Sequence, residues 1–163
     1  MKKMFCLMLT GMLVVCFTMA VSAQDKVAKP ADAKELVKKI IDYAKANGCE
    51  KTLKEIQSGS SFKLYKNATA SASTLNGISL AHSKVPALVG KSIMDIKDAE
   101  GKPFVRTSLE NRKKNLTSLQ THEYKWMDTK TNKVETRTMV GIGYACGGST
   151  GDVSFAVTYE GKM

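Results

Sequence analysis

Cysteine and histidine are the residues of this chain best suited to bind a metal or to act as nucleophiles. After the first 23 residues each of them occurs twice, as Cys49, His82, His122 and Cys146. These positions are widely separated and have none of the close spacings typical of zinc sites. No serine or cysteine has an evident partner base with an orienting group. The residues therefore predict no metal site and no catalytic centre.

Two further motifs have weak chemical meaning. Asp95, Asp98 and Glu100 lack the alternating oxygen ligands and the closing glutamate of a calcium loop, and they fit a polar turn better. The glycines between residues 141 and 148 lack the strand and helix context of a nucleotide-binding loop. We therefore expect neither an enzyme nor a cofactor.

The first 23 residues have the pattern of a secretory signal peptide. Lys2 and Lys3 precede an apolar run, and Val21-Ser22-Ala23 has small residues at a cleavage site. The alternative is an uncleaved anchor, because the run is close to the length that spans a bilayer. We expect cleavage after Ala23, which leaves residues 24–163 as a periplasmic or secreted protein.

Export has consequences for the cysteines and for the charge. Cys49 and Cys146 remain, and an oxidising compartment favours one disulfide between them over two separate thiols. The net charge of residues 24–163 is about +8, which favours small carboxylates, envelope polyanions or acidic protein faces as partners. Nucleic acid is not expected, since the basic residues are spread out. The clusters Arg112-Lys113-Lys114 and Lys38-Lys39 are typical of solvated helix faces.

The hydrophobic pattern predicts helices first and strands afterwards. Residues 24–31 are polar and form a short linker, and a helix begins at Asp32, which caps it. A second helical segment covers residues 50–57. A hairpin follows, closed by the two-residue turn Asn76-Gly77.

The remaining pattern gives one more helix and three strands. The helix starts at Pro103 and runs to about Asn115, and the alternating segments are residues 122–128, 134–143 and 153–159. This order predicts one α+β domain over residues 32–163. Its antiparallel sheet has about five strands, with the long N-terminal helix on one face.

The central segment of the chain resembles a known family. It contains Leu80-Ala81-His82, then Leu88-Val89-Gly90-Lys91, then an acidic turn that ends in Gly101-Lys102-Pro103-Phe104-Val105. This order and spacing are similar to those of single Cache domains, the PAS-like extracytoplasmic sensors of chemoreceptors and sensor kinases. Tyr124-Lys125-Trp126 matches a further element of that family. The resemblance implies a PAS-like sheet and a domain that binds a small molecule without converting it.

The resemblance also implies where a ligand binds. Cache ligands lie against one sheet face, under the loop and helix that follow the leucine-alanine-histidine strand. The matching residues here are His82, Tyr124, Trp126 and Arg137, and Arg137 can grip a carboxylate through paired hydrogen bonds. Each of the four also fits a purely structural role, as a core aromatic or as a surface side chain.

One strand departs from the family pattern. Residues 69–74 are small, where Cache domains carry aromatic or large β-branched residues. Small side chains change the width and depth of the pocket, or they mark a strand that leans on a partner.

The main expectation is an exported Cache-type sensor of a small organic anion that signals through a separate membrane receptor or kinase. The alternative is an envelope or protein-interaction module that has no small ligand.

Overall fold

The computed structural model describes residues 27–59, 62 and 65–163. The predicted signal peptide and the start of the predicted linker lie outside the described residues. The main elements are α1 (Pro30–Asn47), α2 (Cys49–Ser58), β1 (Ala68–Thr74), β2 (Ser79–His82), α3 (Phe104–Lys114), β3 (Gln120–Asp128), β4 (Lys133–Ala145) and β5 (Asp152–Glu160). Two short 3-10 helices are η2 (Pro86–Leu88) and η3 (Gly148–Thr150). None of the helices in these ranges is both long and apolar enough to cross a membrane.

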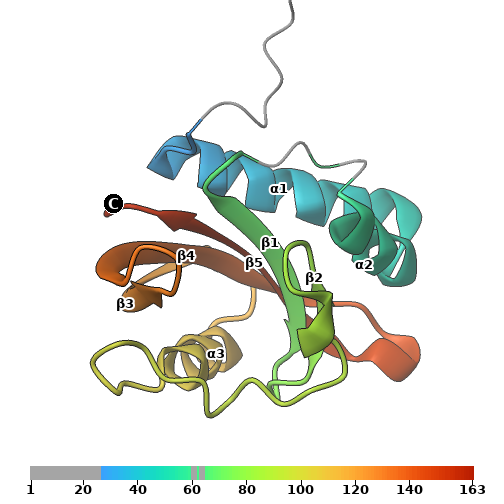
Figure 1. The fold of residues 1–163 in the computed structure, drawn as a ribbon. Coiled ribbons are helices and arrows are strands. Elements are labelled where there is room, and N and C mark those ends of the chain that lie inside the picture. Colours follow the sequence, from blue (N-terminus) through green and yellow to red (C-terminus); the bar gives the residue numbers. More distant parts are fainter. Residues whose placement is uncertain (1–26, 60–61, 63–64) are drawn as a thin grey trace, which may run out of the picture.

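The five strands form one antiparallel sheet in the order β2-β1-β5-β4-β3. Figure 1 shows α1 crossing one face of this sheet and α3 lying against the opposite face. The predicted α+β class, the five-stranded antiparallel sheet and the long N-terminal helix are confirmed.

Alternation along β5 separates the two faces of the sheet. Val153, Phe155, Val157 and Tyr159 are at most 1% exposed, and they pack in one core with the inner side chains of α1. Ala68, Ala70 and Ala72 of β1 belong to the same core. The intervening residues of β1 and β5 face α3, so their small and polar side chains are available to line a site there.

The start of α1 differs from the prediction by two residues. The helix begins at Pro30, and Asp32 is its third residue, where its Oδ2 accepts a hydrogen bond from the backbone N–H of Lys29 at 2.8 Å. Proline suits the first helical position, because its φ is already helical and no backbone N–H is needed there. The predicted linker of residues 24–31 therefore ends two residues too late.

The predicted hairpin is present, but its turn has three residues. Thr74 N–H donates to the carbonyl of Ile78 at 2.9 Å, which leaves Leu75, Asn76 and Gly77 between the paired residues. Gly77 has a φ of +83°, which glycine adopts without strain. A three-residue loop that ends in a left-handed residue replaces the predicted two-residue turn.

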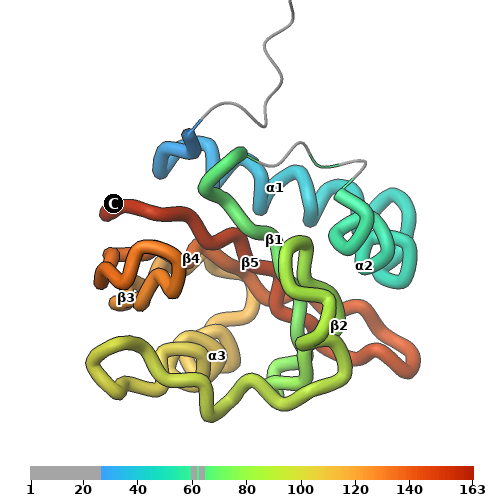
Figure 2. The backbone as a smooth tube through the Cα atoms, viewed as in Figure 1, coloured from blue at the N-terminus to red at the C-terminus, as the bar shows by residue number. Residues whose placement is uncertain are grey.

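Two covalent or polar links tie distant parts of the chain together. A disulfide joins Cys49 at the start of α2 to Cys146 after β4, with a Cα–Cα distance of 5.8 Å. The side chain of Asn67 links both ends of the described chain, because its Oδ1 accepts from Ala28 N–H at 2.6 Å and its Nδ2 donates to the Glu160 carbonyl at 3.2 Å. In Figure 2 the start of α1 and the C-terminus lie on the same side of the molecule.

The basic cluster on α3 is only partly solvated. Lys113 and Lys114 are exposed as predicted, but Arg112 is 2% exposed, so the prediction for Arg112 is wrong. Its Nη1 donates to Ser154 Oγ at 2.9 Å, and burial lowers the pKa of its guanidinium to about 10. Lys38 and Lys39 are exposed on α1, as expected.

Candidate ligand-binding site

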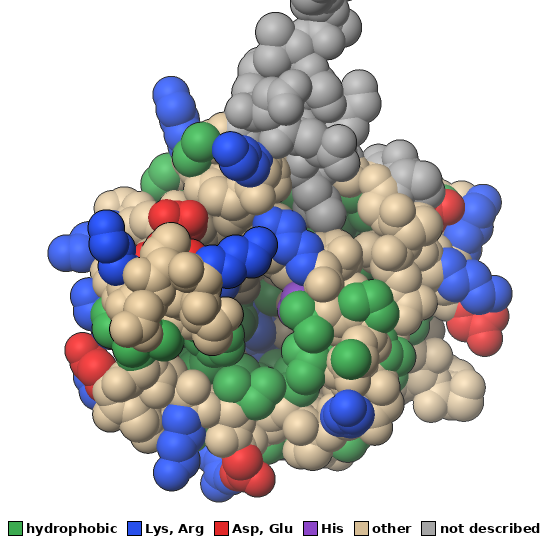
Figure 3. Space-filling model, viewed as in Figure 1, with side chains coloured by type: hydrophobic (Ala, Val, Ile, Leu, Met, Phe, Trp, Pro, Cys, Tyr) green, Lys and Arg blue, Asp and Glu red, His purple; other side chains and the backbone are tan. Residues whose placement is uncertain are grey.

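A cavity of about 410 Å³ lies on the face of the sheet that α3 covers. The sheet forms its floor, and the segment between β2 and α3 forms its roof. Figure 3 shows the molecule hollowed on this face, with hydrophobic side chains and with lysine or arginine around the opening. The lining residues are Thr69, Ser71, Ala72, Ser73, Ser79, His82, Lys84, Val85, Leu88, Ile93, Ile96, Phe104, Val105, Tyr124, Trp126, Arg137, Met139 and Thr158.

The four residues that the resemblance implied all line this one cavity. His82 ends β2, while Tyr124 and Trp126 lie two residues apart on β3 and so share a face. Arg137 on β4 is the register partner of Tyr124. The sheet therefore gathers, around one space, side chains that are up to 55 positions apart in sequence.

The guanidinium of Arg137 is held in place but not fully paired. Its Nη2 lies 3.6 Å from Glu135 Oε2, and its Cζ lies 5.5 Å from the centre of the Trp126 ring. Its Nε is buried, and no described residue accepts a hydrogen bond from it. An acidic ligand group can therefore gain a charge-assisted hydrogen bond here.

Tyr124 supplies a buried hydroxyl beside Arg137. Burial raises the pKa of the Tyr124 phenol, and the positive charge of Arg137 together with hydrogen bonds to Thr158 and Arg137 opposes this rise. The ring stacks on Phe104 of α3 with 3.9 Å between centroids, and Trp126 meets Phe104 edge-on at 6.4 Å. The phenol is thus a neutral donor on a rigid aromatic wall.

The hydrogen bonds of His82 fix the form of its ring. Nδ1 accepts from the backbone N–H groups of Lys84 at 3.2 Å and of Val85 at 2.9 Å. Burial and the positive charge of Lys84 lower the pKa of His82. The ring is therefore neutral, with its proton on Nε2, where it can be donated to a ligand.

Lys84 is a lining residue that the sequence analysis missed. Its Nζ donates to the Lys66 carbonyl at 2.9 Å. Burial and the charge of Arg137 lower the pKa of Lys84, while Glu160 raises it. The sequence offered no local signal for this position, because Lys84 follows the end of β2 in an irregular segment.

The small residues of β1 make room for the cavity. Thr69, Ser71 and Ser73 face the cavity, whereas Ala68 and Ala70 face α1. The predicted effect of these small residues on the pocket, and the alternative of a strand that leans on a partner, both stay predictions.

A polar turn anchors the roof of the cavity to the sheet. The Asp98 carboxylate accepts hydrogen bonds from the backbone N–H groups of Glu100, Lys102 and Lys125. Burial alone would raise the pKa of Asp98, but these hydrogen bonds outweigh it and hold the pKa below its ordinary value. The predicted polar turn is confirmed, and its role is to fix the segment that precedes α3.

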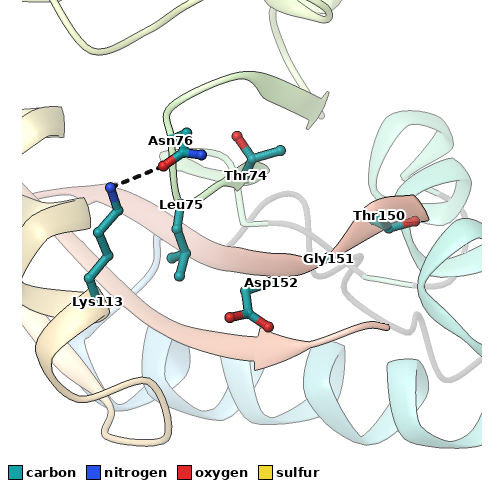
Figure 4. Close-up of a pocket in the computed structure, with 7 residues that line it drawn as sticks. All are labelled: Thr74, Leu75, Asn76, Lys113, Thr150, Gly151 and Asp152. Atoms are coloured by element: carbon teal, nitrogen blue, oxygen red, sulfur yellow. Dashed lines mark hydrogen bonds between the residues drawn. The ribbon is translucent and has the colours of Figure 1, made fainter. Parts of the chain in front are cut away.

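A second, more polar pocket of about 370 Å³ lies near the turn between β1 and β2. Figure 4 shows Lys113 Nζ donating to Asn76 Oδ1, at 3.1 Å, with Asp152 and Thr150 nearby. None of the four predicted site residues lines it. Across the described ranges, no three side chains of histidine, cysteine, aspartate or glutamate are grouped so that they could hold a metal ion.

Comparison with known proteins finds a matching family and several structures of similar fold. The family model described as Single Cache domain 2 matches residues 9–146. A methyl-accepting chemotaxis protein from Vibrio parahaemolyticus has a similar fold, with a TM-score of 0.60 and 14% identity over 79% of this chain and 86% of that one. The predicted PAS-like fold is thereby confirmed.

Two further structures have TM-scores of 0.54. One is a Cache chemosensory domain whose structure explains carboxylic acid recognition, with 17% identity over 79% of this chain and 86% of that one. The other is the periplasmic sensor domain of a chemotaxis protein, with 14% identity over 79% of this chain and 88% of that one. At such identities the likeness concerns the fold alone. No curated protein matches this chain.

Proposed function

Because the chain belongs to the single Cache domain 2 family of non-catalytic sensor domains, we propose that it binds a small organic anion. In this proposal the domain is exported, has no enzymatic activity, and acts through a separate signalling partner such as a membrane receptor or kinase. The periplasmic origin of a similar sensor domain supports the exported location.

The observation that carries the proposal is the charge of the cavity. Arg137 and Lys84 line it, and none of its lining residues is acidic. Glu135 lies 3.6 Å from Arg137, and the negative charge of Glu160 raises the pKa of Lys84. Neither acidic residue lines the cavity. A cavity with apolar walls and a few convergent polar groups suits a small ligand, and this one favours an anion.

The donors converge in a way that suits a carboxylate. Arg137 offers its unpaired Nε, Tyr124 its phenolic O–H, and His82 its Nε2–H. Trp126 and Phe104 give an apolar wall beside them. The similar Cache chemosensory domain that recognises carboxylic acids lends independent support to this ligand class.

A thermal-shift experiment on residues 24–163 with small carboxylates tests the proposal. At 100 times its dissociation constant a ligand adds about 2.7 kcal/mol of stability, which raises Tm by roughly 8–11 °C in a domain of this size. Arg137→Ala abolishes the shift, and Arg137→Lys retains part of it. Arg106→Ala is the matched control, because Arg106 is exposed, pairs with Asp95 and lies outside the cavity.

A flat response to every carboxylate would contradict the proposal. It would favour the alternative of an interaction module that uses its basic surface and has no small ligand.

A further inference from the structure

Two serine side chains lie at the far end of the cavity. Ser73 and Ser79 are register partners across β1 and β2, and both line the cavity. They are 5% and 3% exposed, and their side chains face the cavity. A ligand that carries polar groups to this position can hydrogen-bond to both hydroxyls.

The register of the sheet places these hydroxyls far from the cationic residues. Thr69 pairs with Thr158, which hydrogen-bonds to Tyr124 beside Arg137, so this row marks the cationic end. Ser73 is four residues further along β1, or about 13 Å at the usual rise of a strand. An acid of two or three carbons that is held by Arg137 is much shorter than this span.

Polar groups also occupy the space between the two ends. Ser71 is the register partner of His82, and both line the cavity. The floor thus presents hydroxyl or imidazole groups in successive rows from Thr69 to Ser73. Apart from Lys84, the lining residues opposite this floor are apolar. They come from the segment between β2 and α3 and from the start of α3, and they are Val85, Leu88, Ile93, Ile96, Phe104 and Val105.

From this arrangement we infer that the ligand is a hydroxylated carboxylate of about six carbons, of the sugar-acid class. This inference rests on the proposed function. The carboxylate binds at Arg137, and the hydroxyls bind along β1 and reach Ser73 and Ser79. The C–H face of the sugar acid packs against the apolar roof. An alkyl acid of equal length would make no hydrogen bonds with the floor hydroxyls.

Isothermal titration of residues 24–163 with four probes tests the inference. The probes are D-galacturonate, D-gluconate, hexanoate and lactate, with D-galactose as the uncharged control. At least one sugar acid is expected to bind tenfold or more tightly than both hexanoate and lactate, since one lost hydrogen bond of about 1.4 kcal/mol is a factor of ten. Galactose, which lacks the carboxylate, is expected to bind more weakly than galacturonate.

Variants locate the contact. Ser73→Ala combined with Ser79→Ala is expected to weaken sugar-acid binding about tenfold or more and to leave hexanoate binding unchanged. Ser92→Ala is the matched control, because Ser92 is exposed and lies outside the cavity. The comparison among probes on the unmodified chain needs no variant, so it stands even where a variant folds poorly.

Each failure has its own signature. Binding of lactate or hexanoate as tight as that of the sugar acids, and lost in Arg137→Ala, overturns the inference and leaves the proposed function standing. A sugar-acid preference that survives the double serine variant overturns the assignment to Ser73 and Ser79. Absence of binding by every carboxylate overturns both.

Discussion

The guanidinium of Arg112 lies directly on the backbone of Gly141. A Cβ placed at Gly141 would come within 2.6 Å of Cζ and 2.8 Å of Nε of Arg112. The φ of Gly141 is not positive, so its backbone conformation does not require glycine. Glycine is required in β4 because the Arg112 side chain packs against the backbone at this position. This contact holds the C-terminal half of α3 against the sheet, beside the floor of the cavity.

Gly141→Ala is expected to destabilise the domain by about 1–3 kcal/mol, because the new methyl group overlaps a buried side chain. Urea unfolding of residues 24–163 measures this. In an Arg112→Met background the same substitution is expected to cost less, since a flexible thioether gives way more easily. Equal costs in the two backgrounds would show that the Arg112 contact does not constrain Gly141.

Stability is expected to fall as pH drops from about 7.5 to 5. Burial lowers the pKa of His82 and of His122. The charge of Lys84 adds to the effect at His82, as that of Arg112 does at His122, where Asp98 opposes it. The unfolded histidines take up protons near pH 6.5, above the pKa values of the folded state, so acidification favours unfolding in this window.

Melting temperatures across that pH range, for the unmodified chain and for His82→Asn, check this expectation. The variant keeps an acceptor for the backbone of Lys84 and Val85 but cannot be protonated, so its curve is expected to be flatter. A melting temperature that rises on acidification would contradict the assignment of neutral histidines.

Reduction is expected to destabilise the domain by about 4–5 kcal/mol. The disulfide between Cys49 and Cys146 spans a sequence separation of 97 residues, and cross-links that close long loops restrict the unfolded chain strongly. Urea unfolding with and without a reductant measures the difference. The doubly substituted chain with Cys49→Ser and Cys146→Ser is the control, and reductant should leave its midpoint unchanged. An unfolding midpoint that is the same with and without reductant, in the chain that keeps both cysteines, would mean that the two cysteines are not bonded.

Ligand binding is expected to change the intrinsic fluorescence of the domain. Trp126 is the only tryptophan of the chain, it lines the cavity, and the Arg137 guanidinium lies over its ring. An anion that draws Arg137 toward itself changes the charge next to the indole. Titration with a carboxylate that raises Tm should shift the emission, and Arg137→Ala should abolish the change. A ligand that stabilises the domain without altering the emission would place it away from Trp126.

Much of the fold could be predicted from the sequence, because its elements have clear periodicity. The alternation of Val153, Phe155, Val157 and Tyr159 marked a half-buried strand, and all four pack against α1. The four residues named from the Cache motif all line one cavity. The strand order could not be derived from local pattern alone, since it depends on which strands pair across long loops.

Two charged residues, one in the core and one at the cavity, illustrate why side-chain positions were predicted incompletely. Arg112 lies three residues after Leu109 and seven after Val105, on the apolar stripe of α3, and this spacing was a usable sign that it is buried. The sequence prediction placed Arg112 in solvent because of its charge, although its position on the helix indicated burial. Lys84 follows β2 in an irregular segment, and only the packing of that segment on the sheet places it at the cavity.

The double hydrogen bond made by Asn67 has a practical consequence for protein engineering. One side chain contacts Ala28 near the start of the domain and Glu160 near its end. The chain therefore enters and leaves the domain at nearly the same point. Domains with adjacent ends tolerate insertion into a loop of another protein. Placed inside a fluorescent or enzymatic reporter, residues 27–161 form a cassette whose occupancy can be transmitted to the host through both of its junctions.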